Sequence, residues 1–434
     1  MLPATVDLTT APANLPLIQP AAIIRVDPDW AGAWTVAGDL DGDGQAEIVQ
    51  ARIDEHDDTH AVVAVTVYRQ DGTVLWRWGK PAAGVAALHS DVPCQVHDWD
   101  GDGRPEVVIG TRSQVISLDG ATGRERSAWA TPSPDAVDCL VFARLSGGQR
   151  DDLLIKTRYN RIWAYSADGH LLWEVAEPGG QRTAHQPLVI DIDDDGRDEV
   201  LAGYTLLGSD GQPRWSLDAA GLGLGHGHLD CARVLRSGVT PADWRLVLTC
   251  CGDSQLLCID GTGRVIWRHT GRHFESLTIA DFAGLGEPQV LVDIDHTPGG
   301  AAPLEVYGAD GAARLVLNTS YGRFHPVLNW GDDSAPCIVA CEDRLLVSGV
   351  DGRPIARLAT PVPEGVVFDQ SANPEEHRAQ GSHQLIGAVG NLFGRGQPDL
   401  MLHSNPGGVI WLYRNPASRQ RDLPLGLGRN VTLY

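Results

Sequence analysis

One nine-residue pattern recurs along this chain and constrains its fold more than any other feature. Three nearly complete copies occupy residues 39–47, 98–106 and 191–199, and each is followed at once by a short apolar run. Alternate aspartates place several carboxylates around one small volume, and glycines allow the turn that gathers them. The last acid falls at the ninth position, not the twelfth, and a strand follows instead of a helix, so the pattern differs from an EF-hand.

The pattern predicts a calcium-binding loop between two antiparallel strands, because clustered carboxylates without a cation repel one another. A plain Asp/Gly turn without metal is the alternative. The predicted calcium ligands are Asp39, Asp41, Asp43, Glu47, Asp98, Asp100, Asp102, Glu106, Asp191, Asp193, Asp195 and Glu199.

Degenerate copies of this loop continue its register through the rest of the chain. They start at Arg144, Arg236, Asp281, Asn329 and Asn391, and the starts from residue 98 to residue 329 lie 45 to 48 residues apart. Each unit also contains a second turn, in which Asp-Gly follows a strand and often precedes Trp, as in residues 165–173. Two hairpins, or four short strands, in a unit of about 45 residues indicate a propeller blade.

Eight starts predict an all-β, eight-bladed β-propeller with four short antiparallel strands per blade. Seven blades are possible if the unit near Arg236 or the last unit is not a blade. Residues 1–30 are interpreted as an N-terminal extension with a partly closing strand, and residues 31–434 as a single propeller domain. The recurring Trp76, Trp173, Trp215 and Trp267 are expected to pack between blades.

The composition argues against several classes of protein. The formal charge of −22 disfavours a nucleic-acid partner. No run of about 18 apolar residues is present, so no membrane partner is expected. The N-terminus lacks a basic segment followed by an apolar one, which predicts a cytoplasmic protein, or a secreted one if a leader was removed. Most of the eight cysteines lie in apolar strand-like runs, as buried thiols in a reducing compartment do.

Several motifs carry a resemblance to a known family. The Asp-x-Asp-Gly-Asp-Gly-x-x-Glu units resemble FG-GAP/VCBS calcium-binding propeller repeats. Longer stretches at residues 156–165, 223–230 and 322–327, with His185 before the third loop, resemble the family 11 polysaccharide lyases, the rhamnogalacturonan lyases. The resemblance covers residues 30 to 434 and implies a calcium-rich, eight-bladed catalytic propeller.

Ionisable residues gather at one position of the repeat. The first strand of every propeller blade lines the central channel, so residues four to ten positions before each loop should ring one mouth. A single histidine there is ordinarily structural, but seven of the 15 histidines fall in these windows, which indicates a functional site. The windows contain Trp34, His89, Asp91, Asp138, Arg182, His185, His226, His228, Asp230, Arg272, His273, Arg323, His325 and His383.

The resemblance and the register together suggest roles for these residues. A uronate lyase must neutralise the C6 carboxylate, remove the C5 proton and protonate the leaving oxygen. Arg272 and Arg323 are the predicted carboxylate clamps, His185 and His226 the predicted bases, and Tyr159 a predicted acid or subsite contact. Asp230, with His226 and His228, could chelate a metal. The predicted substrate-binding residues are His89, Arg158, His228, His273, His325 and Trp34.

The sequence therefore predicts a monomeric propeller that cleaves a uronate-containing, rhamnogalacturonan-like poly- or oligosaccharide by β-elimination, with Ca²⁺ as its cofactor. Its expected partner is an acidic polysaccharide or oligosaccharide. Two alternatives stay open. One is a non-catalytic propeller that binds glycans or protein. The other is a glycoside hydrolase that uses a carboxylate pair drawn from Asp91, Asp138 and Asp230.

Overall fold

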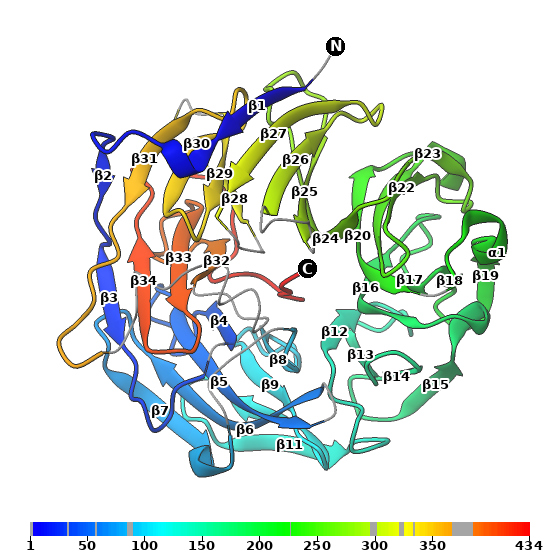
Figure 1. The fold of residues 1–434 in the computed structure, drawn as a ribbon. Helices are drawn as coiled ribbons and strands as arrows, with labels where there is room; N and C mark the ends of the chain where they lie inside the picture. Colours follow the sequence, from blue (N-terminus) through cyan, green and yellow to red (C-terminus); the bar gives the residue numbers. More distant parts are fainter. Residues whose placement is uncertain are drawn as a thin grey trace.

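The protein folds into a ring of eight small β-sheets, the eight blades of a propeller (Figure 1). The computed structural model describes residues 3–32, 34–56, 59–84, 90–225, 227–295, 302–320, 325–332, 335–366 and 385–434. The eight sheets confirm the predicted all-β, eight-bladed fold, and the seven-bladed alternative is wrong.

Each blade runs from an inner strand at the channel to an outer strand at the rim. Blade 1 contains β4 (Trp34–Gly38), β5 (Glu47–His56), β6 (Thr59–Tyr68) and β7 (Val74–Gly79); blade 2 contains β8 (Cys94–His97), β9 (Glu106–Gly110), β10 (Gln114–Asp119) and β11 (Glu125–Ala130). Blade 3 contains β12 (Leu140–Ala143), β13 (Asp152–Lys156), β14 (Arg161–Tyr165) and β15 (Leu171–Ala176); blade 4 contains β16 (Thr183–Ile190), β17 (Glu199–Gly203), β18 (Thr205–Leu207) and β19 (Pro213–Ser216).

The second half of the ring follows the same order. Blade 5 contains β20 (His228–Arg236), β21 (Arg245–Cys251), β22 (Gln255–Ile259) and β23 (Val265–Thr270); blade 6 contains β24 (His273–Ala280), β25 (Gln289–Asp295), β26 (Ala302–Tyr307) and β27 (Ala313–Thr319). Blade 7 contains β28 (Val327–Asn329), β29 (Pro336–Ala340), β30 (Leu345–Ser348) and β31 (Pro354–Leu358); blade 8 contains β32 (Leu385–Gly390), β33 (Asp399–Ser404) and β34 (Val409–Tyr413).

The N-terminal segment closes the ring. Strand β3 (Ala22–Arg25) pairs antiparallel with β34 and supplies the outer strand of blade 8. Strands β1 (Ala4–Asp7) and β2 (Leu17–Ile18) pair parallel with β27 and β31, adding a fifth strand to blades 6 and 7. Blade 8 therefore combines strands from both ends of the chain, which holds the ring closed.

Helices contribute little to the described part of the chain. The α-helix α1 (Ala219–Leu222) connects blades 4 and 5, and the short 3-10 helices are η1 (Leu8–Thr10), η2 (Pro81–Ala83), η3 (Pro178–Gly180) and η4 (Pro241–Asp243). Among the described residues, no helix has the length and apolar character needed to cross a membrane.

The Asp loops lie where the register places them. Strands β4, β8 and β16 end at Gly38, His97 and Ile190, one residue before the three full loops begin. Each loop therefore turns the chain from the first to the second strand of its blade. Those second strands are aliphatic and buried along their length, as Glu106–Gly110 shows, because neighbouring blades cover both of their faces.

Tryptophans join successive blades, as the sequence predicts. The indole N–H of Trp173 in blade 3 donates to the carbonyl of Ser209 in blade 4 at 2.9 Å. The ring packs on Gly211, whose φ is 77° and where an added Cβ would lie 2.8 Å from the indole. Trp76, Trp215 and Trp267 make the same type of contact to the next blade.

Replacing one of these tryptophans should destabilise the ring without touching the channel. We expect Trp173→Ala to lower the free energy of unfolding by about 3 kcal/mol, because it removes buried apolar contact and leaves a cavity between blades. Denaturant unfolding measures the change. Val239→Ala, at a side chain that is 95% exposed, is the control and should change stability by less than about 0.5 kcal/mol. Equal stability of both variants would contradict this role for the indole.

Candidate active site

The inner strands of blades 4, 5 and 6 are interrupted by irregular pairing. The register shifts between Thr183 and Leu188 in β16, between Leu229 and Ala232 in β20, and between Phe274 and Leu277 in β24. These interruptions contain His185, Asp230 and Glu275. A β-bulge re-aims side chains and is frequent beside active sites. The irregular pairing therefore frees these three side chains from the regular alternation of the strand.

Two histidines and an aspartate from neighbouring blades meet in this region. His228 Nε2 lies 3.0 Å from Asp230 Oδ1, and His185 Nε2 lies 3.5 Å from the same oxygen. The two imidazole rings are 4.4 Å apart in an edge arrangement. All three side chains are buried. The predicted convergence of blades 4 and 5 is therefore present in the structure.

The electrostatics of this cluster keep one imidazole neutral. Burial, assisted by the positive charge of Arg158, lowers the pKa of His228 to about 4, although the nearby Glu275 carboxylate acts in the opposite direction. At neutral pH a group with this pKa carries no proton charge. The lone pair of His228 is therefore available to a proton or a cation, although the lowered pKa makes the ring a weaker base than a solvent-exposed imidazole.

A phenol and two guanidinium groups complete the mouth. The Tyr159 ring lies 4.9 Å from the ring of His228 and 5.5 Å from that of His185. The Arg182 guanidinium stacks over Tyr159 at 5.1 Å, and that of Arg158 lies at 5.6 Å. Arg182 is exposed. This combination can hold an anionic group beside neutral proton-transfer groups.

Two carboxylates predicted as candidates for hydrolysis are engaged in other contacts. Asp138 is buried, pairs with Lys156, and accepts from Arg158 Nη1 at 3.1 Å. Asp91 accepts from Thr432 Oγ1 at 2.7 Å and from the N–H of Leu433 at 2.8 Å. Burial raises the pKa of Asp91 to about 6. These contacts disfavour Asp91 and Asp138 as the acid pair of a glycosidase.

The C-terminal segment lies inside the ring and borders the candidate site, and Figure 1 places the C-terminus near the centre. Gln95 of β8 donates to Val431, and Gln186 of β16 donates to Asn430. The Tyr434 ring stacks on His185, with the ring centres 4.8 Å apart. The segment therefore occupies the side of the channel formed by blades 2 to 4.

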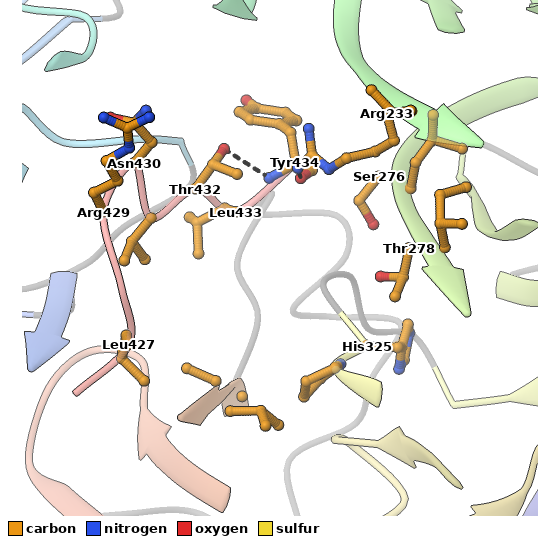
Figure 2. Close-up of a pocket in the computed structure, with 18 residues that line it drawn as sticks. Arg233, Ser276, Thr278, His325, Leu427, Arg429, Asn430, Thr432, Leu433 and Tyr434 are labelled. Carbon is orange, nitrogen blue, oxygen red and sulfur yellow. Dashed lines mark hydrogen bonds between the residues drawn. The ribbon is translucent and has the colours of Figure 1, made fainter. Parts of the chain in front are cut away.

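A pocket of about 460 Å³ lies between this segment and the opposite blades. Figure 2 shows Arg429 to Tyr434 along one side, and Arg233, Thr278 and His325 along the other. Arg233 also contacts the backbone oxygen of Tyr434. His325 is buried and near the backbone oxygen of Val339, at 3.2 Å from Nδ1. His325 therefore lines the same pocket as Tyr434, the residue whose ring stacks on His185.

Other predicted site residues lie elsewhere. Arg272 forms an ion pair with Glu305 of β26, so the structure gives it a partner within blade 6. Trp34 is 2% exposed and donates its indole N–H to Cys94, which corrects its assignment as a substrate contact because a buried ring cannot reach a ligand. His273 lies beside Glu275, with 2.7 Å between Nε2 and Oε1. The predictions for His89, His226 and Arg323 fall outside the described residues.

The three full Asp loops gather their acids as predicted. Each brings three ligand oxygens within 4.8 Å of one another, in the groups Asp39, Asp41 and Asp43; Asp98, Asp100 and Glu106; and Asp191, Asp193 and Glu199. Glu47, Asp102 and Asp195 lie in the same loops outside these groups. Burial is the main cause that raises the pKa of Glu47, Glu106 and Glu199 from 4.5 to about 7.

Arginines enter the three loops to different extents. Arg126 Nη1 lies 3.0 Å from both Asp102 Oδ2 and Glu106 Oε1, and also pairs with Asp100. Arg214 lies 2.7 Å from Glu199 Oε1 and pairs with Asp193 in the third loop.

In the first loop, Arg69 lies 2.7 Å from Asp41 Oδ2. A guanidinium among the acids competes with a cation for the same oxygens. The loop at residues 39–47 therefore fits calcium best, and the loop at residues 98–106 fits it least.

Sequence reasoning gave no role in the mouth region to Cys251, Glu275 and Tyr434. It placed Arg182 in the windows but assigned the carboxylate to Arg272 and Arg323. One repeated signal could have found Glu275: His228-x-Asp230 recurs as His273-x-Glu275, at the same register one blade later. Tyr434 follows the last blade and carries no repeat, so only the folded chain shows its contact with His185.

Fold and site together define a propeller with imidazoles, a phenol and an exposed cationic side chain at one channel mouth. The family model described as Rhamnogalacturonan lyase family 11, C-terminal domain, matches residues 15–131. Rhamnogalacturonan endolyase YesW of Bacillus subtilis (strain 168) is 28% identical over 250 residues, which span 44% of this chain and 39% of YesW. The exolyase YesX of the same bacterium is 24% identical over 250 residues, 44% of this chain and 40% of YesX.

Solved structures share the fold over most of the chain. The crystal structure of YesW has a TM-score of 0.62 at 17% identity and covers 92% of this chain and 76% of its own. The Vibrio cholerae biofilm matrix protein Bap1 has a TM-score of 0.63 at 13% identity and covers 96% and 94%. The chain is thus similar to the family 11 rhamnogalacturonan lyases in sequence and fold, which confirms the resemblance inferred from its motifs. The alignments span about two-fifths of the curated relatives.

Calcium binding to the Asp loops stays a prediction with a defined pH dependence. In the metal-free protein, the raised pKa of Glu47 means that the folded state binds more protons than the unfolded state between pH 4.5 and about 7. The contribution of Glu47 to the stability of the metal-free protein therefore falls as the pH rises through that window. Calcium binds the ionised form, so the rise in melting temperature on adding Ca²⁺ should be larger at pH 8 than at pH 5.5.

Paired melting curves in Ca²⁺ and in chelator, at both pH values, measure this difference. Comparing the two conditions at one pH cancels the titration of groups far from the loops. The variant Glu47→Gln should reduce the calcium-dependent rise, whereas Glu174→Gln, outside the loops, should not. Identical melting in calcium and chelator at both pH values would contradict calcium binding.

Proposed function

We propose that the protein cleaves a uronate-containing, rhamnogalacturonan-like poly- or oligosaccharide by β-elimination at the mouth formed by blades 3 to 5. The observation that carries the proposal is the contact of the Tyr159 ring with the neutral His228 on one side and with the exposed Arg182 on the other. The similarity to proteins named as rhamnogalacturonan lyases supports the substrate class.

The chemistry assigns a separate task to each group. Arg182 pairs with the C6 carboxylate of the uronate and stabilises the charge that develops when the neighbouring carbon loses its proton. The His228 imidazole, which is neutral at pH 7 and lies beside Asp230, accepts the C5 proton. The C4–O bond then breaks as the C4–C5 double bond forms.

The leaving glycosidic oxygen needs a proton in the same reaction. Tyr159 is partly exposed and contacts both histidine rings and Arg182, and we assign this proton transfer to its phenol. His185 stacks on Tyr434 and contacts Asp230, the carboxylate beside His228. We assign His185 the role of positioning His228. No atom of water is incorporated, which separates this reaction from hydrolysis.

The same cluster could instead hold a metal ion. The ligand atoms of His185, His228 and Asp230 lie within 4.8 Å of one another. Two imidazoles and one carboxylate suit a borderline transition metal better than Ca²⁺, which prefers oxygen ligands. A cation bound there would supply positive charge toward the substrate carboxylate, and Tyr159 and Arg182 would keep the positions described above.

Kinetics of single variants test the assignment of the proton-transfer groups. Incubation with pectic rhamnogalacturonan should produce the ultraviolet absorbance of an unsaturated uronate. We expect His228→Ala and Tyr159→Phe each to lower kcat at least about 100-fold, because each removes one proton transfer. His170→Ala, at an exposed histidine outside the mouth, is the control and should keep the activity of the parent.

Full activity of His228→Ala and Tyr159→Phe would contradict the assignment of these two residues to proton transfer. Binding of the polysaccharide without product, across a panel of uronate polymers, would identify a glycan-binding propeller instead of a lyase.

A second comparison tests which arginine binds the uronate. Arg182→Ala should raise KM and lower kcat, because it removes the cation at the open side of Tyr159. Arg272→Ala should have a much smaller effect on KM, since Arg272 pairs with Glu305. Melting curves of both variants control for stability. A larger increase in KM for Arg272→Ala than for Arg182→Ala would instead assign the carboxylate to Arg272.

A further inference from the structure

A second cluster of metal-ligating side chains lies beside the proposed site and has no task in the lyase chemistry. It contains Cys251 at the end of β21 in blade 5, and His273 and Glu275 at the start of β24 in blade 6. The Cys251 Sγ and His273 Nε2 atoms are 3.1 Å apart, and His273 Nε2 is 2.7 Å from Glu275 Oε1. All three ligand atoms lie within 4.8 Å of one another.

The backbone holds these residues in place independently of one another. Cys251 pairs with His228 at the end of β21, and His273 pairs with Asp295 at the start of β24. Glu275 lies in the register shift between Phe274 and Leu277, which turns it out of the regular ladder. Cys251 and Glu275 are buried, with 8% and 4% of their surface exposed. Two blades therefore present three donors to one small, shielded volume.

We propose that Cys251, His273 and Glu275 bind one thiophilic transition-metal ion of the Zn²⁺ class. Zinc accepts thiolate sulfur, imidazole nitrogen and carboxylate oxygen, whereas Ca²⁺ requires oxygen ligands. Three protein ligands leave a fourth tetrahedral position for water or for a substrate oxygen. The ion would cross-link blades 5 and 6 at the channel mouth.

The observed spacing needs only a small opening to accept the ion. Tetrahedral zinc with ordinary bond lengths separates sulfur from nitrogen by about 3.5 Å and nitrogen from oxygen by about 3.4 Å. The present separations of 3.1 Å and 2.7 Å are shorter by well under 1 Å. Side-chain rotation can supply this difference. Binding releases the Cys251 thiol proton to solvent, because the ligand is the thiolate.

The ion would differ from the predicted calcium ions in ligand chemistry and in place. The calcium loops join first to second strands and contain carboxylates only, whereas this cluster contains sulfur and nitrogen and joins two blades. The proposal does not depend on the lyase reaction, because metal binding is measured without substrate. An inactive protein that still binds the ion would refute the proposed function alone.

Cobalt substitution tests this site directly. The protein is stripped with chelator, placed in excess Ca²⁺ to fill the Asp loops, and titrated with Co²⁺. We expect one equivalent to produce tetrahedral cobalt bands in the visible region and a thiolate-to-cobalt charge-transfer band in the near ultraviolet. Addition of Zn²⁺ should abolish both signals, and further Ca²⁺ should not.

Matched cysteine variants assign the sulfur ligand. Cys251→Ser should lose the charge-transfer band, while Cys250→Ser, at the preceding buried cysteine of the same strand, should keep it. His273→Gln should weaken cobalt binding by at least about tenfold with the thiol retained, which keeps the test valid if one cysteine variant does not fold. No charge-transfer band in the parent protein, or an unchanged band in Cys251→Ser, would overturn the proposal.

Discussion

In five of the eight blades, the turn between the first and second strands is held by a hydrogen bond that the carboxylate of the ninth loop residue accepts from a backbone N–H of the same loop. Glu47 Oε2 accepts from the N–H of Leu40 at 2.8 Å. The same contact occurs in the other full loops and, with a shorter acid, in two degenerate ones: Glu106 to Trp99, Glu199 to Ile192, Asp152 to Leu145, and Asp399 to Leu392. In these five blades the bond fixes the turn at the end of the inner strand, and two of them form it although their loops have lost most of their aspartates.

That constraint explains how much of the structure the sequence could predict. The loop register determines the eight blades, the inner strand of each and the convergence of His185, His228 and Asp230. It could not predict the irregular pairing in β16, β20 and β24, because the spacing of the loops gives the length of a unit but not which of its residues pair across the strands. The register likewise places Arg272 at the mouth but does not show that this side chain forms an ion pair with Glu305.

The repeat pattern also could not predict the position of the C-terminal segment. Its contacts join residues separated by more than 200 positions, such as Thr432 with Asp91 at 2.7 Å, and no repeat encodes them. The segment occupies the side of the channel at blades 2 to 4, and the exposed Arg182 and the partly exposed Tyr159 lie beside the buried His228. The eight blades are therefore not equivalent around the channel. Burial lowers the pKa of His228 to about 4, so this imidazole is neutral at physiological pH.

The central claim is that this mouth breaks a glycosidic bond by elimination. Mass spectrometry of rhamnogalacturonan products formed in isotopically labelled water tests it most directly. The account predicts products that end in an unsaturated uronate and contain no oxygen from water, with no such products from His228→Ala. Products that incorporate labelled oxygen, or unsaturated products formed equally well by His228→Ala, would contradict it.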